Sequence, residues 1–362
     1  MWGILTGMLI VAVGAGVHTA ANLHYDDSLV AFQDAGAVAE NRQIDLAADA
    51  DELDAAAAAA GDIAAADSAT LMPAGTRQEL DSAIAAVETT ASDADAATAA
   101  SFPEAGTKPT WMWELFAESA RLADDTTALQ ERTDDFEMLN EDVTDAETSV
   151  EDTALRAAQA AASAASDLEA AHVNARNPEI IAVRTAAEIV AGIAELDHET
   201  ATRYAELEAA VAAMLASEQA ELAEKAGPLY GPRVEIEAFA RSLAPGVLLD
   251  FDWSPTVPGY DGPSNGGWTT WWYGDPGYST IALSDYIAES WPAEWAKALV
   301  AHEVGHAISV KCEAMYDSSD QDTIEAWATA WAISMGFSDR ANGTDVYGAP
   351  PQSMIDAAAN CR

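Results

Sequence analysis

The chain has 362 residues with 61 acidic and 16 basic side chains, and its formal net charge is -45 at pH 7. Such a charge argues against nucleic acids and against anionic membrane surfaces as partners, because their phosphates would be repelled. The length allows two or three domains. Eight of the eleven Trp residues lie between Trp253 and Trp331. Large aromatic side chains anchor packed cores, so the compact domain is expected at the C-terminal end.

The N-terminal segment is apolar, and residues 2–23 contain no Lys, Arg, Asp or Glu. Because about 20 apolar residues suffice to cross a bilayer, we assign residues 1–25 to a single-pass transmembrane anchor. The alternative is a signal peptide that is cleaved near the small residues 19–21, which would release a secreted protein. Both interpretations place most of the chain outside the cytoplasm. In that compartment the two cysteines, Cys312 and Cys361, are expected to form a disulfide.

Residues 26–227 are rich in Ala, Asp, Glu, Thr and Ser, a composition that favours helices. Pro and Gly interrupt this region in three places, so we expect about four long helices, separated near residues 72–75, 101–110 and 177–178. Large apolar side chains recur every seven residues from Leu115 to Val150, as in a coiled coil or helical hairpin able to self-associate. We interpret the region as an acidic stalk. Its first part, residues 26–110, holds few large apolar side chains and is expected to be partly disordered.

The Gly- and Pro-rich segment at residues 227–232 has the composition of a linker, and the pattern changes beyond it. Short β-prone runs predict strands, and longer apolar runs predict helices. The expected strands are residues 247–253, 268–273 and 278–283, and the expected helices are residues 234–243, 291–310, 322–335 and 352–360. Strands followed by helices indicate an α+β domain that covers residues 228–362.

The predicted helix over residues 291–310 contains the motif His302-Glu303-Val304-Gly305-His306. Residues four apart share one face of a helix, so both imidazoles can bind a single metal ion. Glu303 projects about 100° further round the helix, which places its carboxylate beside the metal as a general base. His302 and His306 are also the only histidines beyond residue 228.

A catalytic zinc ion needs a third protein ligand and an open fourth position. The metzincin continuation of the motif fails, because Ser309 and Cys312 stand where that motif has Gly and a third His. We favour Glu325, which lies 19 residues after His306 on the next predicted helix. Cys312 as a thiolate and Asp320 or Asp322 are the alternatives. The disulfide is the more expected fate of Cys312, and support of a histidine from behind is the more expected role of either Asp.

The HExxH motif, followed by Glu325 in a Glu-Ala-Trp-Ala helix, resembles the gluzincin-type metallopeptidases, especially small exported HExxH proteins of actinobacteria. The resemblance covers about residues 230–362 and none of the helical region. It implies a small zincin-like fold, with His302, His306 and Glu325 as zinc ligands and Glu303 as the base. It also implies that residues 277–283 form an edge strand along which an extended substrate lies.

Two features depart from the resemblance. Thr329 stands where thermolysin-like members carry an Asp, and no His follows His306 to stabilise an oxyanion. Tyr316, Tyr347 and Arg340 are the candidates for that second role.

The sequence therefore predicts a membrane-tethered, extracytoplasmic endopeptidase that uses Zn²⁺ to hydrolyse peptide bonds with metal-activated water. Its expected partners are a peptide or protein substrate, a membrane through the N-terminal helix, and a second copy of the chain through the helical stalk. Two competing hypotheses are a helical envelope or virion-associated interaction protein with an inactive zincin-like cap, and a peptidoglycan-cleaving amidase or peptidase. The complete set of His302, Glu303, His306 and Glu325 argues against the first, and no wall-binding repeat supports the second.

Overall fold

The computed structural model describes residues 2–257, 266–273 and 277–362, and the side chains from residue 15 onward. The chain divides into two compact units. The first, called the helical unit, comprises the residues up to Ala162 together with Ile189–Ala205. The second, called the C-terminal unit, comprises Ser163–Glu188 and Glu206–Arg362.

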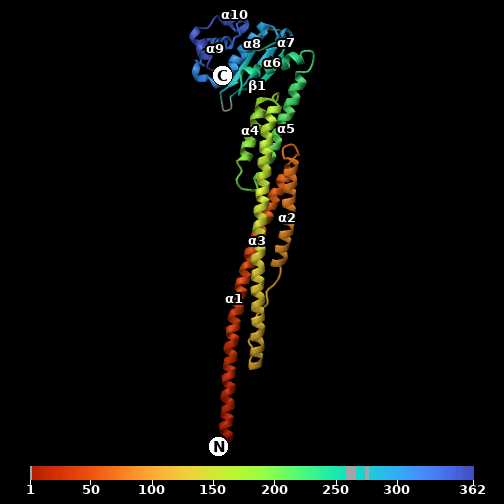
Figure 1. Cartoon of the computed structure of the whole chain (residues 1–362), viewed down its shortest axis with the longest axis vertical. Coiled ribbons are helices and arrows are strands. Elements are labelled where there is room, and N and C mark those ends of the chain that lie inside the picture. The colour runs from red at the N-terminus through yellow and green to blue at the C-terminus, as the bar shows by residue number, and fades with distance from the viewer. Residues whose placement is uncertain (1, 258–265, 274–276) are drawn as a thin grey trace. The chain divides into compact units, whose positions relative to one another are not determined.

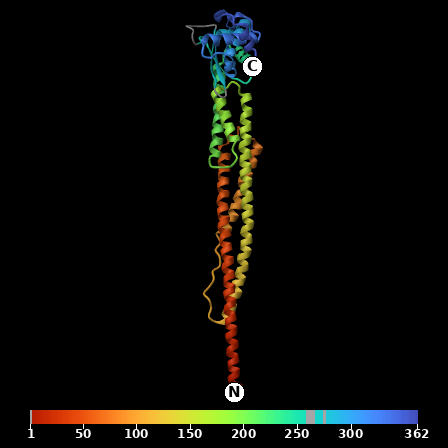
Figure 2. The same ribbon diagram turned by 90° about the vertical axis from the view of Figure 1, so that its left-hand side faces the viewer.

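The helical unit is built on three helices, α1 (Trp2–Ala66), α2 (Ala74–Thr98) and α3 (Met112–Ala171), the last of which continues into the second unit. Helices α1 and α3 run side by side in the same direction (Figures 1 and 2). Their buried side chains recur every seven residues, as in a coiled coil, at Tyr25, Phe32, Ala39, Leu46 and Leu53 on α1 and at Leu115, Leu122, Leu129, Phe136, Val143 and Val150 on α3. Helix α2 follows the same spacing with Leu80, Val87 and Ala94.

Partial disorder over residues 26–110 was the wrong expectation, because α1 and α2 cover most of that range. The apolar side chains of α1 are few, but their heptad spacing lines them up against α3. The three predicted breaks are confirmed. A further break separates α4 (Asn177–Ala191) from α5 (Thr200–Glu224), where the Asp197 carboxylate accepts hydrogen bonds from the Thr200 amide and hydroxyl, each at 2.8 Å. The region therefore contains five helices among its described residues rather than about four.

The predicted membrane anchor is not supported by the described part of the chain. No helix among the residues searched there combines the length and the hydropathy needed to cross a membrane. The anchor was predicted over residues 1–25, and the side chains of residues 1–14 lie outside what the structure describes.

The C-terminal unit contains one small sheet of β1 (Leu248–Ser254), β2 (Gly267–Trp272) and β3 (Tyr278–Ser284). All three predicted strands are confirmed, and a mostly helical unit with this sheet agrees with the predicted α+β class. The strand order is β1-β3-β2, with β1 parallel and β2 antiparallel to β3. Residues 277–283 are therefore not an edge strand, because β3 pairs on both sides. The edge that lies nearer the HExxH motif belongs to β2.

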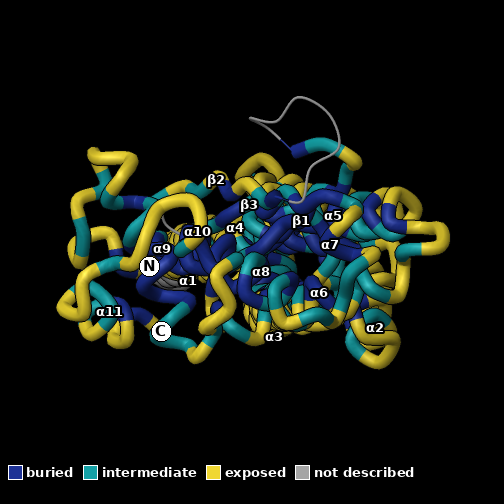
Figure 3. Tube along the Cα trace, turned by 90° about the horizontal axis from the view of Figure 1, so that it is seen from above, coloured by how far each residue is buried: buried dark blue, intermediate teal, exposed yellow. Residues whose placement is uncertain are grey.

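Helices pack against this sheet and against each other. They are α6 (Tyr230–Leu243), α7 (Asp285–Ser290), α8 (Glu294–Ala307), α9 (Gln321–Ser334), α10 (Thr344–Tyr347) and α11 (Gln352–Ala358), with 3₁₀ turns at η1 (Ile308–Lys311), η2 (Glu313–Met315) and η3 (Arg340–Asn342). Helix α8, which carries the HExxH motif, is buried along most of its length (Figure 3). The single helix predicted over residues 291–310 thus begins at Glu294 and ends in a 3₁₀ turn.

Close packing of α8 on α9 fixes the distance between the two helices that carry the motif and Glu325. A Cβ atom at Gly305 would lie 2.7 Å from the Ala328 carbonyl oxygen, so only glycine permits this approach. On α9, the side chains of Trp327 and Trp331 are almost completely buried in the core. The predicted disulfide is confirmed, since Cys312 after α8 is bonded to Cys361 at the end of the chain.

The C-terminal unit extends beyond the predicted boundary at residue 228. Lys225 Nζ lies 2.9 Å from Glu237 Oε2, and these side chains are 2% and 1% exposed. The Asn177 amide, at the start of α4, donates to Asp250 Oδ1 at 2.8 Å, and its side-chain amide donates to the Ser279 carbonyl at 3.0 Å. Buried polar contacts therefore join the start of α4 to the sheet and the residue after α5 to α6, although the composition of these segments is that of a stalk and linker.

Candidate metal centre

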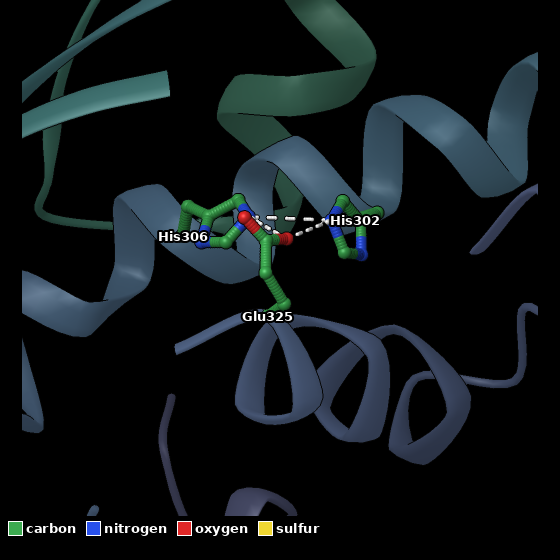
Figure 4. Close-up of side chains that lie close together, drawn as sticks. All are labelled: His302, His306 and Glu325. Carbon is green, nitrogen blue, oxygen red and sulfur yellow. Dashed lines mark hydrogen bonds and ion pairs between the residues drawn. The ribbon is translucent and has the colours of Figure 1, made fainter. Parts of the chain in front are cut away.

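Two histidines of α8 and one glutamate of α9 converge on a single point (Figure 4). Glu325 Oε2 lies 3.2 Å from His302 Nε2 and 3.1 Å from His306 Nε2, and the two Nε2 atoms are 3.2 Å apart. The helical spacing of four residues brings the imidazoles together, and the approach of α9 across Gly305 supplies the carboxylate. The structure thus brings together all three residues predicted as metal ligands.

The orientation of His302 is set by the backbone of η3. Its Nδ1 lies 3.0 Å from the Asn342 carbonyl oxygen, which can only accept a hydrogen bond, so Nδ1 donates to it and Nε2 is turned toward the cluster. Thr329 Oγ1 is further away, at 3.4 Å from Nδ1. The next residue, Gly343, has a φ of 102°, and a Cβ atom there would lie 2.7 Å from the imidazole and 2.2 Å from the Thr329 hydroxyl. Glycine is required at this turn both for its conformation and for space.

His306 is oriented differently, by an aromatic ring. The indole of Trp271 on β2 stacks on its imidazole with 5.5 Å between ring centroids and 8° between the ring planes. The Nδ1 atom of His306 is buried and has no hydrogen-bond partner among the described residues. Stacking by Trp271 therefore takes the place of the hydrogen bond that usually fixes a metal-binding histidine.

Glu325 is held as an ionised carboxylate. Burial alone would raise its pKa, but hydrogen bonds and charge interactions with His302 and His306 outweigh that effect and keep the pKa well below its usual range. The second oxygen, Oε1, accepts a hydrogen bond from the Gln321 amide at 2.9 Å, one turn earlier on α9. Because Gln321 holds Oε1, the other oxygen, Oε2, is directed toward the imidazoles.

Glu303 lies outside this cluster and contacts the sheet. Its Oε2 accepts a hydrogen bond of 2.7 Å from the hydroxyl of Thr269 on β2, and the side chain is buried. A Cβ atom at Gly267 would lie 2.6–2.7 Å from the Glu303 side chain, so the glycine provides the space in which the carboxylate sits. The carboxylate is thus fixed by the strand and kept apart from the three converging atoms.

These groups share one open cleft of about 550 Å³. One wall is strand β2, and the other side carries the two histidines, both glutamates, Gln321 and Tyr347. The ring of Tyr347 stacks on His302 at 5.7 Å. The cleft wall is rich in aromatic side chains, and none of the described residues that line it is Lys or Arg.

The alternative ligands predicted from the sequence lie elsewhere. Cys312 is in the disulfide, and the Asp320 carboxylate caps α9 by accepting from the Thr323 amide at 3.0 Å. Asp322 is exposed, so neither aspartate supports a histidine. The short-range hydrogen-bonding preference of Asp for the residue before a helix explains the role of Asp320.

Of the three candidates for oxyanion stabilisation, only Tyr347 is among the described residues that line the cleft. The Tyr316 hydroxyl is 2.8 Å from the hydroxyl of Tyr273, and its ring stacks on Trp327. Arg340 pairs with Asp345 at the surface.

Sequence reasoning missed Thr269, Trp271, Gln321 and Asn342. Thr269 and Trp271 point to the same face of β2, because they are two residues apart, and that face could have been matched to the HExxH helix. Gln321 precedes Glu325 by one helical turn, which is a readable pattern. Asn342 contacts His302 through its backbone carbonyl, so the type of its side chain could not have predicted this role.

The donor set fits a metal ion. Around a tetrahedral ion with bonds of about 2.0–2.1 Å, ligand atoms lie about 3.3 Å apart, which is close to the separations in this cluster. In the described part of the chain, this is the one group of three or more His, Cys, Asp or Glu residues with such convergence. Two imidazole nitrogens and a carboxylate oxygen suit zinc and several other transition metals.

Comparisons with protein families, with curated proteins and with solved structures found no match to this chain.

Proposed function

We propose that the chain is a zinc-dependent endopeptidase with its active site in the β2–α8–α9 cleft. The observation that carries the proposal is the convergence of His302, His306 and Glu325 beside a separately held Glu303. Two histidines with a purely structural role would need neither the ionised Glu325 carboxylate between them nor the Glu303 carboxylate on the same open cleft. Zinc held there would polarise the substrate carbonyl and lower the pKa of a bound water to about 7.

Glu303 is proposed to move the protons. The Thr269 hydroxyl fixes one carboxylate oxygen, and the space at Gly267 leaves room for the group beside the cluster rather than in it. From this position Glu303 accepts a proton from the attacking water and passes it to the leaving nitrogen. Tyr347, which lies over His302, is the described side chain best placed to donate a hydrogen bond to the developing oxyanion.

The cleft favours cleavage of internal peptide bonds. An enzyme that removes C-terminal residues needs a cation for the substrate carboxylate, and Arg is the usual partner of that group. The described lining contains no such residue. The edge of β2 that borders the cleft offers backbone groups to an extended polypeptide, whose side chains would contact Trp268 and Trp272.

Location outside the cytoplasm is part of the proposal and is supported by the disulfide. Disulfides persist in oxidising compartments and are rare in the cytosol. The Cys312–Cys361 bond encloses α9, the helix that presents Glu325, and so links the compartment to the integrity of the site.

The test is to replace Glu303 by Gln in the full chain. The variant should keep its fold and its metal, as measured by elemental analysis, and lose hydrolysis of an unfolded protein such as casein, because only the proton transfer is removed. Glu294→Gln, an exposed site at the start of the same helix, is the matched control and should keep full activity. Undiminished hydrolysis by the Glu303 variant would overturn the proposed role.

A further inference from the structure

Four apolar side chains are exposed together at the beginning of α3. Trp111, Met112, Trp113 and Phe116, here called the aromatic patch, are 58%, 36%, 59% and 43% exposed. The indole rings of Trp111 and Trp113 stack on each other with their centroids 5.2 Å apart and their planes at 11°. Two exposed tryptophans stacked beside further apolar side chains form a contiguous surface that usually marks an interaction site.

The patch lies beside one particular stretch of α1. The ring of Phe116 is 6.2 Å from that of His24, and Lys108, just before α3, is 2.5 Å from the Asp26 carboxylate. Leu115, between the patch residues, packs in the same core cluster as residues 21 and 25 of α1. The aromatic patch is therefore level with residues 21–26 of α1, where the uncharged run of residues 2–23 ends and charged side chains begin.

Two kinds of partner could cover such a patch, a second copy of the chain or a lipid surface. Their charges distinguish between them. Residues 1–227 hold 43 acidic and 10 basic side chains, so two copies brought together through this region would repel each other. A lipid surface without net charge carries no such penalty. Trp residues also concentrate at the membrane–water interface, where one end of the ring is apolar and the other reaches water.

We infer that the aromatic patch rests in the interfacial layer of a zwitterionic lipid bilayer, beside the uncharged residues 15–23 of α1. Trp111 and Trp113 then form a second contact with the membrane, next to the uncharged run. Two parallel helices that meet the surface together hold a fixed direction relative to it, which one helix alone does not. Glu114, the charged residue within the patch, lies in the first turn of α3, where a carboxylate is favoured by the helix N-terminus.

The test uses the full chain with phosphatidylcholine vesicles whose acyl chains are brominated at a shallow or a deep position. Bromine quenches nearby tryptophans, and Trp111→Phe/Trp113→Phe removes the two fluorophores while it keeps the patch apolar. The proposal predicts that quenching of these two tryptophans, obtained as the difference between the wild-type chain and this variant, is strong and is greater for the shallow bromine. Equal quenching of both proteins, or no binding of the chain to the vesicles, would overturn it.

A second measurement tests the binding contribution. Trp111→Ser/Trp113→Ser should weaken partitioning into phosphatidylcholine vesicles by about tenfold, since two exposed aromatic side chains lose their burial. Met138→Ser is the matched control, because Met138 is 61% exposed on the same helix but lies 22 residues beyond Phe116, about 33 Å along the axis. It should leave partitioning unchanged. Sedimentation that shows a dimer lost only in the Trp double variant, with unchanged partitioning, would instead assign the patch to a second copy of the chain and refute the proposal.

Discussion

The ion pair of Lys225 and Glu237 provides the sharpest test of how the C-terminal unit is held together. Both side chains are almost completely buried, and Glu237 also accepts a hydrogen bond from the Trp253 indole at 2.9 Å. Lys225→Met would leave the buried Glu237 carboxylate without its nearer cationic partner. Breaking a buried pair in this way costs about 3–5 kcal/mol. Since Arg241 remains 3.4 Å from Glu237, we expect the lower end, about 3 kcal/mol.

Urea unfolding followed by tryptophan fluorescence measures this loss, because eight of the eleven Trp residues lie in the C-terminal unit. Lys297→Met is the matched control, since Lys297 pairs with a Glu294 side chain that is 80% exposed, and it should cost less than about 1 kcal/mol. Lys225→Met/Glu237→Gln should recover part of the stability, because a neutral amide can still accept from Trp253. A Lys225→Met protein as stable as the control would refute the argument that this pair ties α5 to the unit.

Three further results are expected. Burial raises the pKa of Asp250 to about 7. The stability that its protonated form contributes is therefore full below about pH 4 and is lost as the pH rises toward 7. Asp250→Asn should flatten this decline in the urea midpoints measured between pH 4 and pH 8. Replacing Cys312 and Cys361 by Ala opens a loop closed by residues 49 apart and should lower the free energy of unfolding by about 3–4 kcal/mol, whereas an unchanged value would mean that the bond adds nothing. Gly267→Ala should reduce hydrolysis by displacing Glu303 while metal content stays at the wild-type level, and full activity would contradict the close approach of β2.

The part of the site that lies on a single helix could be predicted from the sequence. His302 and His306 are four residues apart, so any helix over that segment brings them together. Glu325 was identified from its place on a following helix that is rich in small residues, and Gly305 shows why that helix can approach. The strands and the disulfide were also predicted, because alternation and cysteine pairing are local or nearly unique features.

The strand order and the extent of the unit could not be read in the same way. Which of three short strands lies in the middle depends on long-range pairing, and nothing local distinguishes β3 from β2. Lys225 looked like part of an acidic helix, and its partner Glu237 lies beyond the Gly- and Pro-rich segment. The sequence predicted a domain of residues 228–362 that begins after a linker. Without Lys225 and Asn177, such a fragment would expose or leave unpaired the groups that they contact.

The central claim is that His302, His306 and Glu325 hold a zinc ion that hydrolysis requires, and metal stoichiometry tests it most directly. Full-length protein purified from an oxidising host, dialysed and measured by elemental analysis should contain one zinc ion per chain. His302→Ala and Glu325→Ala should each lose that zinc, whereas Glu303→Gln should keep it. Full zinc occupancy in the His302→Ala protein, or a correctly folded wild-type chain that binds no zinc even when the ion is supplied, would contradict the account.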